Sequence, residues 1–147
     1  MRFAITGFPR SRTKWASVFL STPDCPVIHD AHPDSFYDIE AVSTPLVITH
    51  WKHLPKDTPI AFIKRDVNDV RASWAKFLFD DSLVSQCEEA LEGFLSNNNV
   101  KIFDYYQLDA KELWEYCHNT AVSNEYIKVF TDMNIVQQQM ENIRRVA

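Results

Sequence analysis

The sequence predicts a three-layer α/β protein, in which helices cover both faces of a mainly parallel sheet. Short, uninterrupted apolar runs at residues 3–5, 46–48 and 60–63 are typical of strands that are buried on both faces. Segments with helical periodicity, such as 67–78 and 83–95, alternate with these runs. Ligands of such sheets bind at the carboxyl ends of the strands, so we expect the functional residues at that edge.

A strand, turn and helix open the chain. We expect a strand at residues 2–6, whose apolar run leads into Gly7. A helix follows at residues 11–20, where three apolar side chains recur at the i, i+3, i+4 spacing of one helix face. This helix ends before Pro23, because the residue that precedes a proline disfavours helical backbone.

The middle of the chain is expected to add three strands. A short one covers residues 25–29, and the polar segment 31–41 forms a loop with room for one helical turn. Two continuous apolar runs, at 46–49 and 60–63, are expected inside the sheet. The polar residues that follow these runs, like those after Thr6, should then lie at the carboxyl edge.

The second half is expected to be mainly helical. Asp66 is a predicted N-cap, because its side chain can accept hydrogen bonds from the first turn of the next helix. Asp109 with Glu112 resembles a capping box at the start of another helix. The remaining expected elements are a helix, a strand and a terminal helix, at residues 82–96, 100–105 and 134–146.

Composition and charge limit the possible functions. The 147 residues suit one domain, residues 1–147, and 46% of them are apolar, which is enough for a core. The net charge of −5 argues against a nucleic-acid or membrane binder, since both need a broad basic surface. Three scattered cysteines and the lack of a long apolar run favour a cytoplasmic protein. Any anion site must therefore be local.

A basic, hydroxyl-rich turn connects the first strand to the first helix. It contains Gly7, one of only two glycines, and continues as Pro9-Arg10-Ser11-Arg12-Thr13-Lys14-Trp15. The first N–H groups of a helix lack partners and the helix dipole is positive there, so this layout predicts an oxyanion site. The turn differs from the G-x-x-x-x-G-K-[ST] loop of nucleotide triphosphatases, because Arg12 replaces the second glycine and Thr13-Lys14 reverses the last pair.

A second cluster follows the apolar run at 60–63. Arg65 lies at the expected strand end, and Ser73 lies about two turns into the next helix. An arginine and a helical serine could hold one phosphate from two directions.

Together the two clusters resemble the cofactor motifs of the sulfotransferases that use 3′-phosphoadenosine 5′-phosphosulfate. Residues 9–15 are similar to the first motif, roughly P-[KR]-S-G-T-T-W. Arg65, Asp66, Asp69 and Ser73 match the second, roughly R-[ND]-x-x-D-x-x-x-S, in register. The resemblance implies a P-loop nucleotide-hydrolase-like fold and transfer of a sulfuryl group to an acceptor hydroxyl or amine.

The resemblance also implies a role for each matched residue. Arg10, Ser11 and Thr13 would hold the 5′-phosphosulfate, and Arg65 with Ser73 would hold the 3′-phosphate. The rest of the expected cofactor site is Gly7, Pro9, Arg12, Lys14 and Trp15. Arg10 would also act in catalysis by stabilising the bridging oxygen, assisted by Lys14, so no metal is expected.

The chain departs from the family pattern in three places. Arg12 replaces a glycine, and it would either crowd the phosphate or add a contact to it. Lys14 replaces a hydroxyl residue. The late Gly-rich basic segment that completes the 3′-phosphate site in many members is absent, and Arg144-Arg145 is at best its remnant.

Three residues are candidates for the base that activates the acceptor. Residues 49–55 resemble a K-T-H-L-P motif, which His53 fits through His-Leu-Pro and His50 through Thr-His. Asp30 resembles the acidic base of another branch of the family. Two H-x-x-H pairs, 29/32 and 50/53, lack helical context and a nearby cysteine, so we expect no zinc site.

Two other functions remain as alternative hypotheses. A nucleotide kinase-like phosphoryl transferase is one, because residues 100–104 resemble an apolar strand that ends in a magnesium-binding Asp. A non-catalytic binding protein with a degenerate cofactor site is the other, and Arg12 motivates it. The acceptor is a small molecule or biopolymer that the sequence does not identify, and an oligomer is compatible with the sequence.

Overall fold

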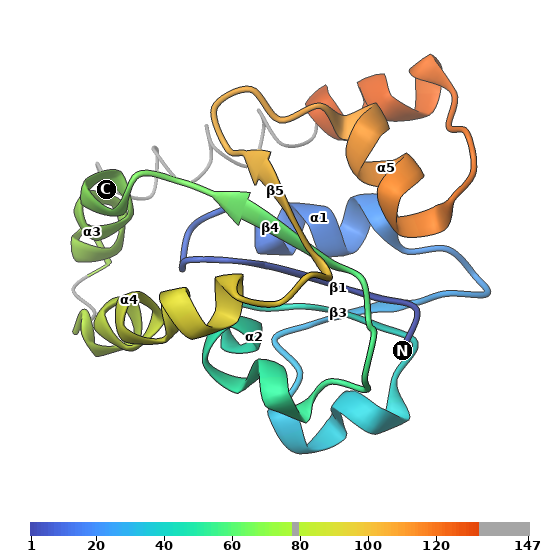
Figure 1. The fold of residues 1–147 in the computed structure, drawn as a ribbon. Helices are drawn as coiled ribbons and strands as arrows, with labels where there is room; N and C mark the ends of the chain where they lie inside the picture. The colour runs from blue at the N-terminus through green and yellow to red at the C-terminus, as the bar shows by residue number, and fades with distance from the viewer. Residues whose placement is uncertain (78–79, 133–147) are drawn as a thin grey trace.

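The computed structural model describes residues 1–77 and 80–132, and these residues form an α/β fold around one parallel sheet (Figure 1). The strand order is β2-β3-β1-β4-β5, and every neighbouring pair is parallel. The strands are β1 Phe3–Gly7, β2 Val27–His29, β3 Ala41–Ser43, β4 Ile60–Lys64 and β5 Val100–Asp104. The predicted fold class is therefore confirmed.

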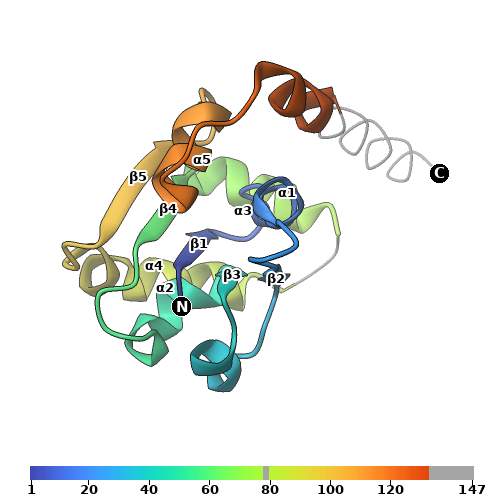
Figure 2. The same ribbon diagram turned by 90° about the vertical axis from the view of Figure 1, so that its right-hand side faces the viewer.

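Helices cover both faces of this sheet (Figures 1 and 2). The α-helices are α1 Thr13–Leu20, α2 Leu46–His50, α3 Val67–Ala75, α4 Ser82–Leu95 and α5 Ala110–His118, and the short 3-10 helices are η1 Pro33–Asp38 and η2 Trp51–His53. Side chains of α1 and α5 pack on one face, and those of η1, α2, α3 and α4 pack on the other. Among the described helices, none combines the length and apolar character needed to cross a membrane.

The central strands β1 and β4 are apolar over most of their length because both of their faces are buried. In β1, Phe3 and Ile5 join the core beneath α1 and α5, whereas Ala4 joins the core of the opposite face. In β4, Ile63 belongs to the first core and Phe62 to the second. Successive strand side chains point to opposite faces, so a strand with a core on each side favours apolar residues at most of its positions.

Both predicted helix caps are present. The Asp66 carboxylate accepts hydrogen bonds from the backbone N–H groups of Asn68 and Asp69 at the start of α3. The Asp109 side chain accepts from the N–H of Glu112 at the start of α5. These caps fix where each helix begins, and the first one fixes the direction of the chain as it leaves β4.

One predicted strand is wrong. Residues 46–49 belong to α2, and the third strand is β3, which starts at the end of the segment expected to be a loop. Pro45 has helical backbone angles and precedes a helix whose Val47 and Ile48 are buried. A run of four apolar and β-branched residues fits a strand or one helical turn equally well, and here the proline favours the turn. The third carboxyl end therefore lies at Ser43, and not at Thr49.

Two expectations fall outside the described part of the chain. The predicted terminal helix at residues 134–146, with Arg144-Arg145, lies there, as does Leu78. Residues 124–132 are helical and contribute Tyr126 and Phe130 to the aromatic packing around α1.

Candidate functional site

A cleft of about 690 Å³ lies at the carboxyl edge of the sheet. Segments that follow all five strands contribute to its lining. Its polar lining residues are Arg10, Arg12, Thr13, Lys14, His29, Asp30, Thr44, Arg65, Asp69, Ser73, Lys76 and Tyr105. This is the edge at which parallel α/β sheets bind ligands.

The centre of the cleft is the point where two neighbouring strands send the chain in opposite directions. After β1 the chain enters α1 on one face of the sheet, and after β4 it enters α3 on the other face. The two connections separate at the edge and leave a crevice between them. Both sequence motifs were expected to follow these strands, and both do.

The turn between β1 and α1 has an unusual backbone. Arg10 and Arg12 both have a φ of 68°, in the left-handed region that favours glycine. Arg12 is the N-cap of α1, its side chain makes no cap hydrogen bond, and the next residue is helical. A left-handed residue beside a right-handed one turns successive N–H groups toward a common point, which makes an anion-binding concavity. The helix dipole adds positive potential at the same place.

Ser11 lies beneath this turn and does not line the cleft with the other described residues. It is fully buried, and its Oγ has no hydrogen-bond partner. A Cβ added to Gly7 would lie 2.9 Å from the Ser11 Cβ and 2.8 Å from the carbonyl oxygen of Ile63. Gly7 therefore provides room for Ser11 to pack, and we find no direct part for Gly7 in the lining.

Three other residues that were predicted to bind the cofactor lie in this turn or at the start of α1. Pro9, Thr13 and Trp15 all border the cleft. The carbonyl of Thr13 accepts a 2.5 Å hydrogen bond from the Ser43 hydroxyl, which ties the start of α1 to the end of β3. The Trp15 indole N–H donates to the carbonyl of Phe130 at 2.9 Å, and its ring is stacked on Phe19. Trp15 is thus mainly a core residue with one edge at the cleft.

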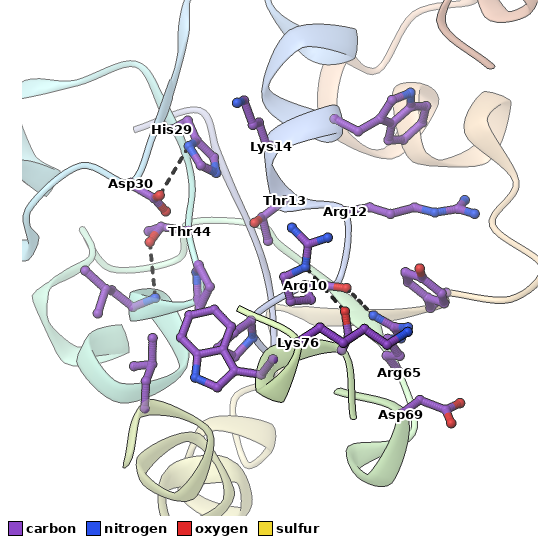
Figure 3. A pocket seen from close by; sticks show the side chains of 18 of the residues that line it. Arg10, Arg12, Thr13, Lys14, His29, Asp30, Thr44, Arg65, Asp69 and Lys76 are labelled. Carbon is purple, nitrogen blue, oxygen red and sulfur yellow. Dashed lines mark hydrogen bonds and ion pairs between the residues drawn. The ribbon is translucent and has the colours of Figure 1, made fainter. Parts of the chain in front are cut away.

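The two sequence motifs make direct contact in the cleft (Figure 3). The Arg10 Nε donates to the Ser73 Oγ over a long 3.4 Å, and the Arg65 Nη1 donates to the Arg10 carbonyl at 2.6 Å. The Arg10 guanidinium also lies over the ring of Phe77, 4.5 Å from its centroid. Residues more than fifty positions apart are therefore held together as one basic wall.

The cleft is positively charged although the whole chain is negative. Among its described lining residues are three arginines and two lysines, against two aspartates. The chain as a whole carries a formal charge of −5. A concentration of cations in a concave, partly dehydrated site is the electrostatic arrangement that holds an oxyanion.

A titratable pair occupies the opposite side of the cleft from Arg12 and Arg65 (Figure 3). His29 ends β2, and its Nδ1 lies 3.3 Å from the Asp30 carboxylate. Burial lowers the pKa of His29 below its ordinary value, Asp30 acts to raise it, and the nearby Lys14 ammonium acts to lower it. His29 is therefore mainly neutral at pH 7, and a neutral imidazole can accept a proton.

His29 was not among the residues chosen from the sequence as catalytic. Its sequence signals are its place at the end of the predicted strand 25–29, next to Asp30, and its H-x-x-H pairing with His32, and both are weak. Asp30 has a φ of 55°, so the backbone turns sharply after the strand and brings the carboxylate back onto the imidazole. Side-chain contact between consecutive residues depends on that turn, which no residue pattern predicts.

The other two candidate bases lie elsewhere. His50 and His53 are not among the described residues that line the cleft. They occupy the end of α2 and the end of η2, where their rings contact each other with centroids 5.5 Å apart. The His50 Nδ1 lies 2.7 Å from the Thr49 Oγ1 and 3.2 Å from the Leu46 carbonyl. The described residues include no group of three His, Cys, Asp or Glu side chains able to hold a metal ion.

The cleft thus combines an oxyanion cradle, a wall of guanidinium groups and a neutral histidine in one site. Such a site can bind an anionic group, stabilise negative charge that develops on it and accept a proton from a second molecule. No family model matches the chain, and no curated protein and no solved structure matches it.

Proposed function

We propose that this protein is a sulfotransferase that moves a sulfuryl group from 3′-phosphoadenosine 5′-phosphosulfate to an acceptor hydroxyl or amine. The contact between the two motifs carries the proposal. Arg10 from the first motif reaches Ser73 of the second, and Arg65 of the second holds the backbone of the first. The two short motifs resemble those of one family in sequence, and they also come together in one site. Two motifs that were similar by chance would have no reason to lie in contact.

The residues of the cleft fit the donor. The left-handed turn at Arg10 and Arg12 would form a cradle for its 5′ group, and the buried, unpartnered hydroxyl of Ser11 lies beneath that turn. Arg65 and Ser73 lie beside that cradle and would hold its 3′-phosphate. When bound, the donor supplies an activated sulfuryl group. Arg10 and Lys14 would face the negative charge that develops on the leaving phosphate.

We assign the base to His29, with Asp30 as its positioning residue. Asp30 engages Nδ1, so Nε2 is the ring nitrogen that would accept the proton of the acceptor hydroxyl or amine. The new bond forms between the acceptor atom and sulfur, and the bond from sulfur to the bridging oxygen breaks. His50 and His53 have no comparable position relative to the cradle.

The kinase-like alternative has less support. Asp104, which would be its magnesium ligand, ends the outermost strand β5 and accepts a 3.0 Å hydrogen bond from the N–H of Tyr106. It is not among the described residues that line the cleft. We therefore do not develop that function further.

Calorimetric titration with 3′,5′-adenosine bisphosphate, the desulfated donor, tests the proposal. We expect the bisphosphate to bind and ATP with magnesium to bind much more weakly. The Arg65→Ala variant should lose at least about tenfold in affinity, because a hydrogen bond to a charged group contributes about 1.5–3 kcal/mol.

The Arg2→Ala variant is the matched control, since Arg2 is exposed and pairs with Asp24 and Glu40 far from the cleft. It should bind the bisphosphate as the wild type does. Equal binding by Arg65→Ala and wild type, or a preference of the wild type for ATP, would contradict the proposed function.

A further inference from the structure

The two halves of the cleft differ in the side chains that line them. Three arginines follow β1 and β4, in the half where the donor is proposed to bind. The other half is built at the ends of β2 and β3, which are neighbours in the sheet, with His29 opposite Ser43. His29, Asp30 and Thr44 lie together on this side (Figure 3). Because His29 is the proposed base, the acceptor would bind in this half.

Apolar side chains enclose the acceptor half. Pro45 and Leu46 follow β3 at the start of α2, and the backbone N–H of Leu46 donates to the Thr44 hydroxyl at 3.2 Å. Trp74 of α3 and Leu83 of α4 pack against the core that also contains the buried side chains of α2. All four apolar residues line the cleft, and Leu46, Trp74 and Leu83 are only partly buried. Part of their apolar surface is therefore accessible to a ligand.

Few polar groups among the described residues of this half can pair with a ligand. The Trp74 indole N–H donates to the Asp80 carbonyl at 2.7 Å, and the Asp30 carboxylate is engaged by His29. The Thr44 hydroxyl already accepts from a backbone N–H. A sugar carries a hydroxyl on nearly every carbon, and each would need a partner once it leaves water. The lining instead suits a ligand with an apolar body and one reacting polar group.

The charges around His29 favour an acceptor that is neutral before it reacts. The Lys14 ammonium is close enough to lower the pKa of His29, and the cleft is lined by more cations than anions. An aliphatic amine is an ammonium ion at pH 7, because its pKa is about 10. It would be repelled by these cations, and a neutral imidazole is too weak a base to take its proton. An alcohol or a phenol enters the cleft without a charge.

Resting on the proposed function, we propose that the acceptor is a small alcohol or phenol with an apolar body, and that Leu46, Trp74 and Leu83 determine this specificity. The whole cleft measures about 690 Å³, and the donor would fill part of it, so the acceptor is small. The acceptor oxygen forms a bond to sulfur while its proton passes to Nε2 of His29. The bond from sulfur to the bridging oxygen breaks, and its electron pair goes to the leaving phosphate.

Three small acceptors test the chemical class. 2-Phenylethanol and 2-phenylethylamine share one apolar body and differ in the reacting group, whereas sorbitol is a polyol with no apolar body. Each is titrated by calorimetry into the protein saturated with 3′,5′-adenosine bisphosphate, and each is then offered as acceptor with the sulfated donor. We expect 2-phenylethanol to bind at least about tenfold more tightly than the other two, because only it buries a phenyl ring without a charge, and to be the best acceptor.

The Leu83→Gln variant tests the apolar lining, with Leu91→Gln as the matched control. Both leucines belong to α4 and pack, partly buried, against the same core, but Leu91 is not among the described residues that line the cleft. Any loss of stability is therefore common to the two variants. We expect Leu83→Gln to lower the affinity for 2-phenylethanol at least about fivefold and to leave bisphosphate binding unchanged. Leu91→Gln should change neither affinity.

The outcomes separate the acceptor class from the donor. If the wild type binds the bisphosphate but prefers the amine or the polyol, or does not bind 2-phenylethanol, the acceptor class is overturned and the donor site stands. Equal losses of 2-phenylethanol binding in Leu83→Gln and Leu91→Gln overturn the role of the lining. Failure of the wild type to bind the bisphosphate overturns the proposed function, and the acceptor class with it.

Discussion

At the scale of single residues, the environment of His29 determines whether it can act as a base. Three features of the structure shift the pKa of His29. Burial has the largest effect and lowers the pKa, the Asp30 carboxylate raises it, and the Lys14 ammonium lowers it. Asp30 directly follows His29 in the turn after β2, whereas Lys14 belongs to α1. Because the two charges act in opposite directions, replacing either one should move the pKa in a known sense.

We predict that Asp30→Asn lowers the pKa of His29 further and that Lys14→Met raises it toward its ordinary value. Titration of the imidazole C–H signals by NMR measures both shifts without an acceptor. In activity, the acid limb of the pH profile should move to lower pH in Asp30→Asn, because His29 must be neutral to accept a proton. Shifts of the same sign in both variants would show that local charge does not control this imidazole.

At the scale of elements, the two glycines of the chain differ in the space available for an added side chain. Gly7 ends β1 and pairs with Ile63 of β4, whose carbonyl oxygen cannot move without breaking the sheet. Gly93 lies in the interior of α4, where an added Cβ would meet nothing within 4 Å. A methyl group therefore has no room at the first position and ample room at the second.

We predict that Gly7→Ala lowers the free energy of unfolding by about 1–3 kcal/mol, as overpacking of a tight site does. Gly93→Ala should raise it by about 0.5–1 kcal/mol, because alanine loses less backbone entropy than glycine in a helix interior. Urea unfolding monitored by circular dichroism gives both values. A stable Gly7→Ala protein would mean that the β1–β4 contact relaxes easily.

The elements also show what the sequence can predict and what it cannot. The buried strands β1 and β4 were predictable because an apolar run with a core on both faces has few alternatives. The start of α3 was predictable from Asp66, whose cap hydrogen bonds are local. The helix at 46–50 was missed because its apolar run is too short to show a period. Strand β3 has only three residues, which is too few to show a recognisable sequence pattern.

The part of the site that depends on local sequence could be predicted, and the part that depends on tertiary contacts could not. Arg10, Arg65 and Ser73 follow strands that could be recognised, so their meeting at one edge could be expected. The inward direction of Ser11 and the contact of Arg12 with Tyr105 depend on backbone angles and on a strand two places away. Such contacts are set by tertiary structure, and residue spacing does not contain them.

At the scale of the whole molecule, two electrostatic effects compete for an anionic ligand. The chain carries a net charge of −5, which repels a nucleotide as it approaches. The cleft concentrates three arginines and two lysines, which attract it. The Debye length is about 8 Å at physiological ionic strength, so salt screens the distant charges first and the charges inside the cleft last.

The sign of the salt effect on binding shows which of the two dominates. If the local cations dominate, raising the salt concentration from about 0.05 to 0.5 M should weaken bisphosphate binding, since counter-ions compete for the cleft. The loss of affinity should be larger for the bisphosphate than for adenosine 5′-monophosphate, which carries fewer charges. The Arg12→Gly variant, which lacks one cation of the cleft, should reduce that difference.

If repulsion by the whole chain dominated, added salt would strengthen the binding of both nucleotides. We expect weakening, because the cations line the cleft in which the nucleotide would bind, while most of the acidic residues lie elsewhere on the molecule. Calorimetry across the salt series measures the effect.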